Sequence, residues 1–197
     1  MYEYRKLSPE ERQALVEARR KRGFPPHSPP HPHQDAEYYL LTATCFEHRE
    51  RMPDSQRWGQ ALDLLFMHSM LRGIEIRAWV VLPNHYHLLA YVPDFEDVGD
   101  MFRRVHGPTA VEWNRADGTV GEKVWYRFTD RAIRSKRHYY TTLNYIHYNP
   151  VKHHCVTSPY AWEESSVGWY LEHYGRGWLR DLWVMYPLRA YGEGWDV

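Results

Sequence analysis

The chain has few cysteines and no long apolar run, and each shortage excludes a class of protein. Cys45 and Cys155 are its two cysteines among 197 residues, and no Cys-x-x-Cys pair occurs. Neither a disulfide framework nor a cysteine zinc site is therefore expected. No stretch approaches the roughly 20 apolar residues that a membrane span needs, and the charged N-terminus does not resemble a signal peptide. We therefore expect a cytoplasmic protein with no membrane partner.

The chain also lacks an excess of charge, with 25 Lys and Arg residues against 25 Asp and Glu residues. A balanced charge does not indicate a nucleic-acid partner as a basic chain would, so any contact with phosphates must come from local clusters. The segment 127–138 is one such cluster, with a net charge of +4 when its histidine is not counted. Its basic residues, which could instead form a solvated loop, are Arg127, Arg131, Arg134, Lys136 and Arg137.

Histidine and aromatic residues are abundant instead. The chain has 13 His, 9 Trp and 16 Tyr residues. Aromatic side chains fill protein cores, and they also stack on unpaired bases. Residues 157–197 are rich in Trp and Tyr, so we expect this C-terminal extension to pack on the folded domain.

Residues 1–36 are expected to form an N-terminal helix and a linker. Ser8 and Glu11 form a capping-box pattern, and Gly23 and Pro25 predict the end of the helix near Arg22. Five prolines lie between Pro25 and Pro32 and favour an extended linker. The histidines His27, His31 and His33 in this segment could bind a metal, but no cysteine or carboxylate joins them, so a solvated linker is the favoured interpretation.

Residues 37–156 carry the pattern of an α+β domain. The predicted elements are a strand at 38–46, a helix at 55–72, strands at 75–82 and 85–92, a helix at 96–114, a strand at 123–128 and a helix at 135–148. Gly107-Pro108 is expected to kink or split the second helix, and Pro150 to end the last one. This order predicts a ferredoxin-like βαββαβ fold, an antiparallel sheet with helices on one face, followed by an added helix.

Two histidines share one face of the third predicted strand. Side chains alternate along a strand, so His85 and His87 point the same way and Tyr86 points the opposite way. Two imidazoles on one face can chelate one metal ion. The apolar neighbours indicate a buried position, where paired histidines are unexpected, although two hydrogen-bonded histidines would fit as well.

The added helix carries a second candidate group. Tyr145 and Asn149 are four residues apart and share a helix face, although Pro150 disfavours helical geometry at Asn149. A phenol can act as a covalent nucleophile when a metal polarises the phosphate that it attacks. An amide oxygen can complete a metal site with two imidazoles. An aromatic core residue followed by a helix-ending Asn is the plainer alternative, and three other tyrosines lie on this helix.

These segments resemble a known family. Pro83–Leu89 looks like the His-hydrophobic-His signature of single-tyrosine HUH transposases, and Tyr145–His153 resembles the tyrosine helix of the REP-associated tyrosine transposases. The resemblance spans nearly the whole chain, because His27–His31, Val124-Trp125 and Trp162–Ser166 also fit. The chain departs from the pattern at Tyr86, where the family often has an aliphatic residue, and at Pro108.

The resemblance implies a site and a reaction. His85, His87 and Asn149 match the ligands of Mg²⁺ or Mn²⁺, and Tyr145 matches the nucleophile. The family cuts and rejoins single-stranded DNA near short hairpins through a 5′-phosphotyrosine link, which would associate the protein with the nucleoid. The cluster at 127–138 could hold the DNA backbone, with Arg103, Arg104 and His106 on the second helix as lesser candidates.

Three alternatives remain open. A domesticated protein could bind hairpins without cutting, although binding alone has no use for a His, His, Tyr, Asn set. A replication-initiator nickase would use the same chemistry, but such proteins usually carry further domains. A metal protein without a nucleic-acid partner would suit the balanced charge. Small relatives share active sites in dimers and the hairpin-associated group can act alone, so both a monomer and a homodimer are consistent with the sequence.

Overall fold

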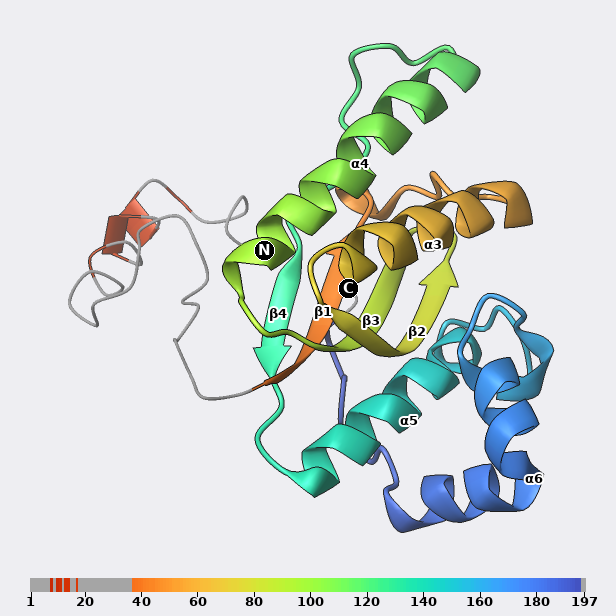
Figure 1. Cartoon of the computed structure of the whole chain (residues 1–197). Helices are drawn as coiled ribbons and strands as arrows, with labels where there is room; N and C mark the ends of the chain where they lie inside the picture. Colours follow the sequence, from red (N-terminus) through yellow and green to blue (C-terminus); the bar gives the residue numbers. More distant parts are fainter. Residues whose placement is uncertain (1–7, 9, 12, 15–16, 18–36, 196–197) are drawn as a thin grey trace. The chain divides into compact units, whose positions relative to one another are not determined.

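The computed structural model describes residues 8, 10–11, 13–14, 17 and 37–195 (Figure 1). The chain divides into two compact units, residues 1–35 and 36–197. In the first unit, the Ser8 amide donates to Glu11 Oε2 at 2.7 Å and the Glu11 amide donates to Ser8 Oγ at 3.2 Å. These two bonds confirm the predicted capping box. The linker histidines His27, His31 and His33 lie outside the described residues.

The second unit is built on one antiparallel sheet. Its strands are β1 (Tyr38–Thr44), β2 (Glu75–Leu82), β3 (His85–Tyr91) and β4 (Thr129–Ala132), in the spatial order β2-β3-β1-β4. β1 pairs with both β3 and β4, and β2 pairs with β3 through a tight two-residue connection. This is the predicted ferredoxin-like order, and it places β3 in the interior of the sheet with neighbours on both sides.

Two helices cover one face of this sheet (Figure 1). They are α3 (Ser55–Met70) and α4 (Glu96–Ala116), and their apolar stripes bury a core with Leu41, Tyr86 and Leu88. The expected split of this helix at Gly107-Pro108 is wrong, because α4 runs through Pro108. A proline removes one backbone donor, and the buried residues Val105 and Thr109 on either side hold the helix to the core.

The fourth strand was predicted one segment too early. Residues 123–128 form a single bridge, between Trp125 and Cys45, while β4 itself is the polar run Thr129–Ala132. Val124 and Trp125 are buried, so their apolar character reflects packing against α4 and not membership of the ladder. An edge strand of four polar or small residues has no hydrophobic alternation to reveal it.

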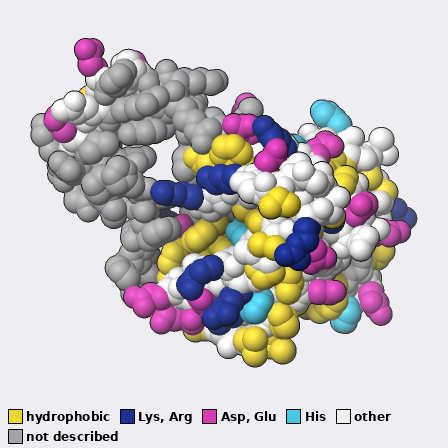
Figure 2. Space-filling view, turned by 90° about the horizontal axis from the view of Figure 1, so that it is seen from above, with side chains coloured by type: hydrophobic (Ala, Val, Ile, Leu, Met, Phe, Trp, Pro, Cys, Tyr) yellow, Lys and Arg dark blue, Asp and Glu magenta, His cyan; other side chains and the backbone are white. Residues whose placement is uncertain are grey.

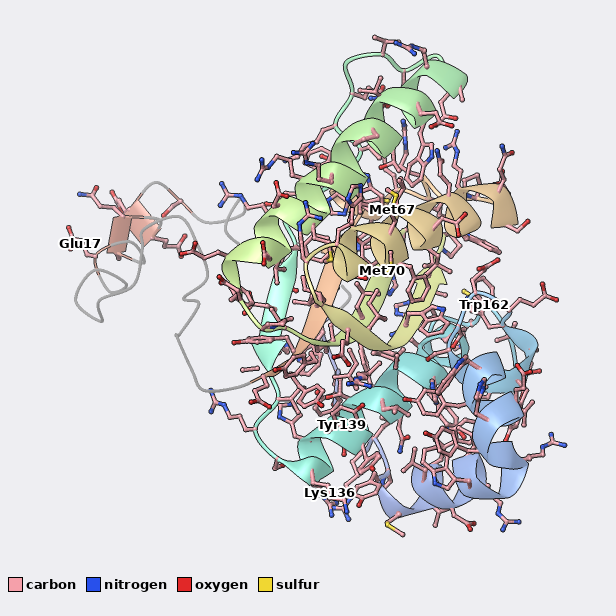
Figure 3. All side chains as sticks on the ribbon, in the orientation of Figure 1. Glu17, Met67, Met70, Lys136, Tyr139 and Trp162 are labelled. Atoms are coloured by element: carbon pink, nitrogen blue, oxygen red, sulfur yellow. The ribbon has the colours of Figure 1, made fainter. Side chains whose placement is uncertain are left out.

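The opposite face is covered by the added helix and the C-terminal extension. The elements are α5 (Lys136–Lys152), η2 (Pro159–Ala161) and α6 (Val167–Met185), which is interrupted at Gly175 where φ is +79°. A short 3₁₀ turn, η1 (Phe46–His48), follows β1. Residues 162–166 line the outer edge of β2: the Trp162 indole donates to the Val81 carbonyl at 2.9 Å, and Ser165 bridges Val80. Figure 3 shows Trp162 at this edge.

The expectation that Pro150 ends the tyrosine helix is also wrong. α5 continues to Lys152, and the His153 amide donates to the Asn149 carbonyl at 3.0 Å. A proline in the last turn removes one internal hydrogen bond, and the residues before it, from Thr142 to His147 and Asn149, are buried against the domain. Asn149 therefore keeps helical geometry one full turn after Tyr145. No helix among the described residues is long and apolar enough to cross a membrane.

Candidate functional site

The two histidines of β3 lie under α5. In the sheet register His85 pairs with Thr44 and Leu82, and His87 pairs with Thr42 and Val80. Their exposed fractions are 2% and 1%. Tyr86 points to the other face, where its hydroxyl meets His106 Nε2 at 2.6 Å. The predicted alternation of the three side chains is therefore present.

Each imidazole is held by its Nδ1 atom and presents its Nε2 atom to α5. His85 Nδ1 lies 2.6 Å from Asn84 Oδ1, and His87 Nδ1 lies 2.7 Å from Thr42 Oγ1. Ligand histidines are commonly held by a hydrogen bond from the nitrogen that does not bind the metal. Neither Thr42 nor Asn84 was predicted as part of the site; the place of Asn84 directly before His85 was the available signal.

The tyrosine helix supplies the other two predicted side chains. Asn149 Oδ1 lies 3.1 Å from His85 Nε2, and the Tyr145 hydroxyl lies 3.4 Å from His87 Nε2. Both α5 residues are buried, like the histidines that they face. The structure thus brings together two imidazoles, an amide and a phenol that lie 58 or more residues apart across the two segments.

Proton counting tests whether these groups suit a cation. Asn84 Oδ1 can only accept, so the single N–H of a neutral His85 ring belongs on Nδ1. The Nε2 lone pair then faces a second acceptor, Asn149 Oδ1, while Asn149 Nδ2 is buried without a hydrogen-bond partner. A cation between the two acceptors removes this conflict, and turning the amide over also removes it.

The kinds of atom that face one another show whether the site suits a metal ion. Among the residues that the structure describes, no three His, Cys, Asp or Glu side chains converge as a metal site, so a site here depends on the Asn149 amide. Two imidazole nitrogens and one amide oxygen are suitable ligands for a divalent transition ion such as Mn²⁺. The ring of His153 also packs against the His85 ring, with centroids 4.8 Å apart. The residues present therefore fit a divalent cation.

The C-terminal extension covers the tyrosine, which the sequence did not reveal. The Tyr145 ring contacts the rings of Tyr191 and Trp195, with centroids 5.7 and 5.6 Å apart. Gly192 lies so close that a Cβ atom there would meet Tyr145 Cε2 at 2.1 Å. Lys152 Nζ donates to the Gly192 carbonyl at 2.9 Å. Only 1% of Tyr145 is exposed as a result.

The predicted basic cluster lies beside this cover. Arg131 is on β4, and its guanidinium stacks on the Trp195 ring at 3.8 Å. Lys136 and Arg137 begin α5, where Figure 3 labels Lys136. All five basic residues of the cluster, including Arg127 and Arg134, are exposed.

The candidates on the second helix are not brought to the same place. Arg103 and Arg104 lie on α4, across the sheet from α5, and both pair with Asp100. The His106 ring is stacked between Phe102 and Trp125, with centroids 5.3 and 4.3 Å away. Burial lowers the pKa of His106 to about 3. The structure therefore gives His106 a packing role on α4.

Comparisons with known proteins extend these observations. No family profile matches the chain. A REP-associated tyrosine transposase of Escherichia coli K12 is 31% identical over 127 residues, which span 64% of this chain and 67% of that protein. A putative REP-associated tyrosine transposase of Haemophilus influenzae Rd is 31% identical over 102 residues, 47% of this chain and 58% of that protein.

A solved structure is similar as well. A REP-associated tyrosine transposase bound to a REP hairpin superposes with a TM-score of 0.60 at 24% identity, covering 74% of this chain and 86% of that one. At that identity the likeness shows a shared fold.

Proposed function

The chain belongs to the REP-associated tyrosine transposases, and from this premise we propose that it cuts and rejoins single-stranded DNA beside hairpins. One observation carries the proposal: His85 and His87 of β3 converge with Tyr145 and Asn149 of α5, which lie 58 or more residues further along the chain. The solved relative is bound to a REP hairpin, which supports DNA hairpins as the partner here. Such a protein would act at the nucleoid, in the cytoplasm.

Metal binding is part of the proposal. His85 and His87 would each bind the ion through Nε2, and Asn149 through Oδ1. The two nitrogen ligands favour Mn²⁺ over Mg²⁺, which prefers oxygen ligands. A divalent cation held there would polarise the scissile phosphate and offset its developing negative charge. Asn84 and Thr42 would keep the two rings in the binding orientation.

The covalent step is assigned to Tyr145. Its phenolic oxygen attacks the phosphorus and forms the P–O(Tyr) bond, while the bond from phosphorus to the 3′ oxygen breaks. The leaving oxygen takes up a proton and becomes a free 3′-hydroxyl, and the phenol proton passes to solvent. The phosphotyrosine preserves the energy of the broken bond, so a second 3′-hydroxyl can reverse the step and join strands.

Binding to hairpins without cutting is the second candidate, and one observation favours it. Tyr145 is covered by Tyr191, Gly192 and Trp195, so its hydroxyl cannot meet DNA in this conformation. In that case the exposed basic cluster from Arg127 to Arg137 would hold the DNA while the tyrosine stays buried.

A labelling experiment tests the proposal. The protein is incubated with Mn²⁺ and hairpin oligonucleotides that carry single-stranded flanks, labelled in parallel at the 3′ or the 5′ end. A 5′-phosphotyrosine link places the label on protein only for the 3′-labelled strand, as a slow band on a denaturing gel. Tyr145→Phe should abolish that band, and Tyr148→Phe, a matched change on the same helix, should keep it.

Two results would contradict the proposal. An adduct that survives in Tyr145→Phe would assign the nucleophile elsewhere. Absence of an adduct across varied hairpins, with binding intact, would support the binding-only candidate.

A further inference from the structure

A second polar site lies beside the covered tyrosine, between the start of α5 and the turn after α6. It is a shallow surface hollow of about 390 Å³, within the range of about 300–1,000 Å³ of small-ligand sites. Arg137, His138 and Thr141 line it from α5, and Leu188, Arg189 and Tyr191 line it from the extension. None of the residues that line it is acidic.

The charge of the hollow indicates an anionic ligand. Arg137 and Arg189 are exposed, and neither has an acidic partner among the residues that the structure describes. Two guanidinium groups from separate elements suit a phosphate, which each can bind through two N–H donors. Arg189 has a φ of +49°, a conformation that is unfavourable for a residue with a side chain and that often marks functional positions.

The electrostatic setting agrees with this assignment. Burial, and then the nearby charges of Arg134 and Arg131, lower the pKa of His138. The positive charges of Arg134 and Arg131 beside this histidine would also attract an anion.

The other wall of the hollow is apolar. Tyr191 is held in this conformation by hydrogen bonds of its hydroxyl to Thr142 Oγ1 at 2.5 Å and to His138 Nε2 at 3.0 Å. Together with Leu188 its ring offers a surface on which a base can stack. The same ring contacts Tyr145, so the hollow and the tyrosine lie on either side of one aromatic residue.

We propose that this hollow binds one nucleotide of the DNA strand near the cleavage point, with its phosphate on Arg137 and Arg189 and its base against Tyr191. The inference rests on the proposed function, since it takes single-stranded DNA as the ligand. A metal ion would not suit the hollow, because guanidinium groups repel cations. The hollow would align the strand before Tyr145 attacks and is separate from the groups proposed to hold the metal.

The test is a scan of phosphate charge. Binding is measured in EDTA on a Tyr145→Phe background, with hairpin oligonucleotides that each carry one neutral methylphosphonate linkage. The double variant Arg137→Gln/Arg189→Gln is compared with Arg115→Gln/Arg180→Gln, which removes the same charge from the last turn of α4 and from α6. Figure 2 shows that basic side chains also occur elsewhere on the surface, so the matched control is needed.

We expect one linkage at which the neutral substitution weakens binding about tenfold. The Arg137→Gln/Arg189→Gln variant should bind the unmodified strand about tenfold more weakly, and neutralising that linkage should not weaken its binding further. In the control variant, neutralising the same linkage should still weaken binding. Equal losses in both variants, or a sensitive linkage that persists without the two arginines, would overturn the inference.

The adduct assay separates this inference from the proposed function. The wild-type chain could form the adduct while Arg137→Gln/Arg189→Gln leaves the sensitivity to each neutral linkage unchanged. That result would overturn the nucleotide site and leave the proposed cutting intact. Conversely, one neutral linkage could weaken binding only when Arg137 and Arg189 are present, while the wild-type chain never forms an adduct. That result would overturn the proposed cutting and leave the nucleotide site intact. Failure of Tyr145→Phe to bind any hairpin would overturn the site as well.

Discussion

At the scale of single residues, two side chains outside the His-x-His pair hold the histidine rings in place. His85 and His87 each use Nδ1 for a hydrogen bond, to Asn84 and Thr42, and so present Nε2 on the same side. The His-x-His pattern was visible in the sequence because a strand alternates its side chains. The supporting Thr42 lies 45 residues away, and only the register of β1 on β3 brings it to the ring.

Thr42→Val should weaken metal binding without removing a proposed ligand. The valine keeps the shape but loses the hydroxyl that holds His87 Nδ1, so we expect the Mn²⁺ dissociation constant to rise about tenfold or more. The free Mn²⁺ signal in electron paramagnetic resonance measures it. Thr44→Val, the same change two residues along β1, should leave the affinity unchanged; equal effects of the two changes would contradict the assigned role.

At the scale of elements, the sequence predicted those with strong periodicity and misplaced those without it. The three strands of alternating or apolar residues and the two helices of the α3–α4 face were predicted within a few residues. β4 was missed because Thr129–Ala132 is a polar edge strand, while buried Trp125 resembled a strand residue. Pro108 and Pro150 were expected to interrupt their helices, but α4 is buried on both sides of Pro108, and α5 is buried up to Pro150 and continues to Lys152.

The packing of α4 also predicts a pH effect. The folded chain holds His106 neutral, with its pKa lowered to about 3, whereas an unfolded histidine titrates near 6.5. The unfolded state therefore binds the proton first as pH falls, and the stability that His106 contributes is complete above about pH 6.5 and decreases below it. At pH 5 this decrease should reach about 2 kcal/mol.

Urea unfolding at pH 7 and pH 5 measures that loss. His106→Gln keeps a polar group near the Tyr86 hydroxyl and removes the titration, so it should lose about 2 kcal/mol less than wild type between the two values. His173→Gln, an exposed change on α6, should behave as wild type. A wild-type-like decrease in His106→Gln would show that other groups cause the acid sensitivity.

At the scale of the whole molecule, the C-terminal end of the folded unit returns to the site. The sheet and α5 build it, and the segment after α6 closes over it through Tyr191, Gly192 and Trp195. This closure could not be predicted from the sequence, because the aromatic content of the extension indicates packing but not its target. The tightest contact is at Gly192, whose φ of +82° and lack of a Cβ allow the chain to pass over the Tyr145 ring.

Gly192→Ala should therefore release the cover. The added Cβ would overlap the Tyr145 ring, and the extension can move more easily than a ring held in α5. We expect the initial rate of adduct formation with Mn²⁺ to rise several-fold over wild type. Gly194→Ala is the matched control, because its φ is also positive, at +71°, and no atom lies within 4 Å of the added group. A rate that falls in Gly192→Ala, or rises equally in both, would contradict the covering role.

The cover over Tyr145 has a consequence for how a cell could tolerate such an enzyme. If the covered form is favoured by about 2.7 kcal/mol, roughly one molecule in 100 is open at any moment, and under the proposed function stray single strands would be cut correspondingly slowly. A strand that binds the open form 100-fold more tightly than the covered one would bring the two forms to about equal populations. The substrate would thereby promote the opening of the site, and selection between strands would take place before any bond is broken.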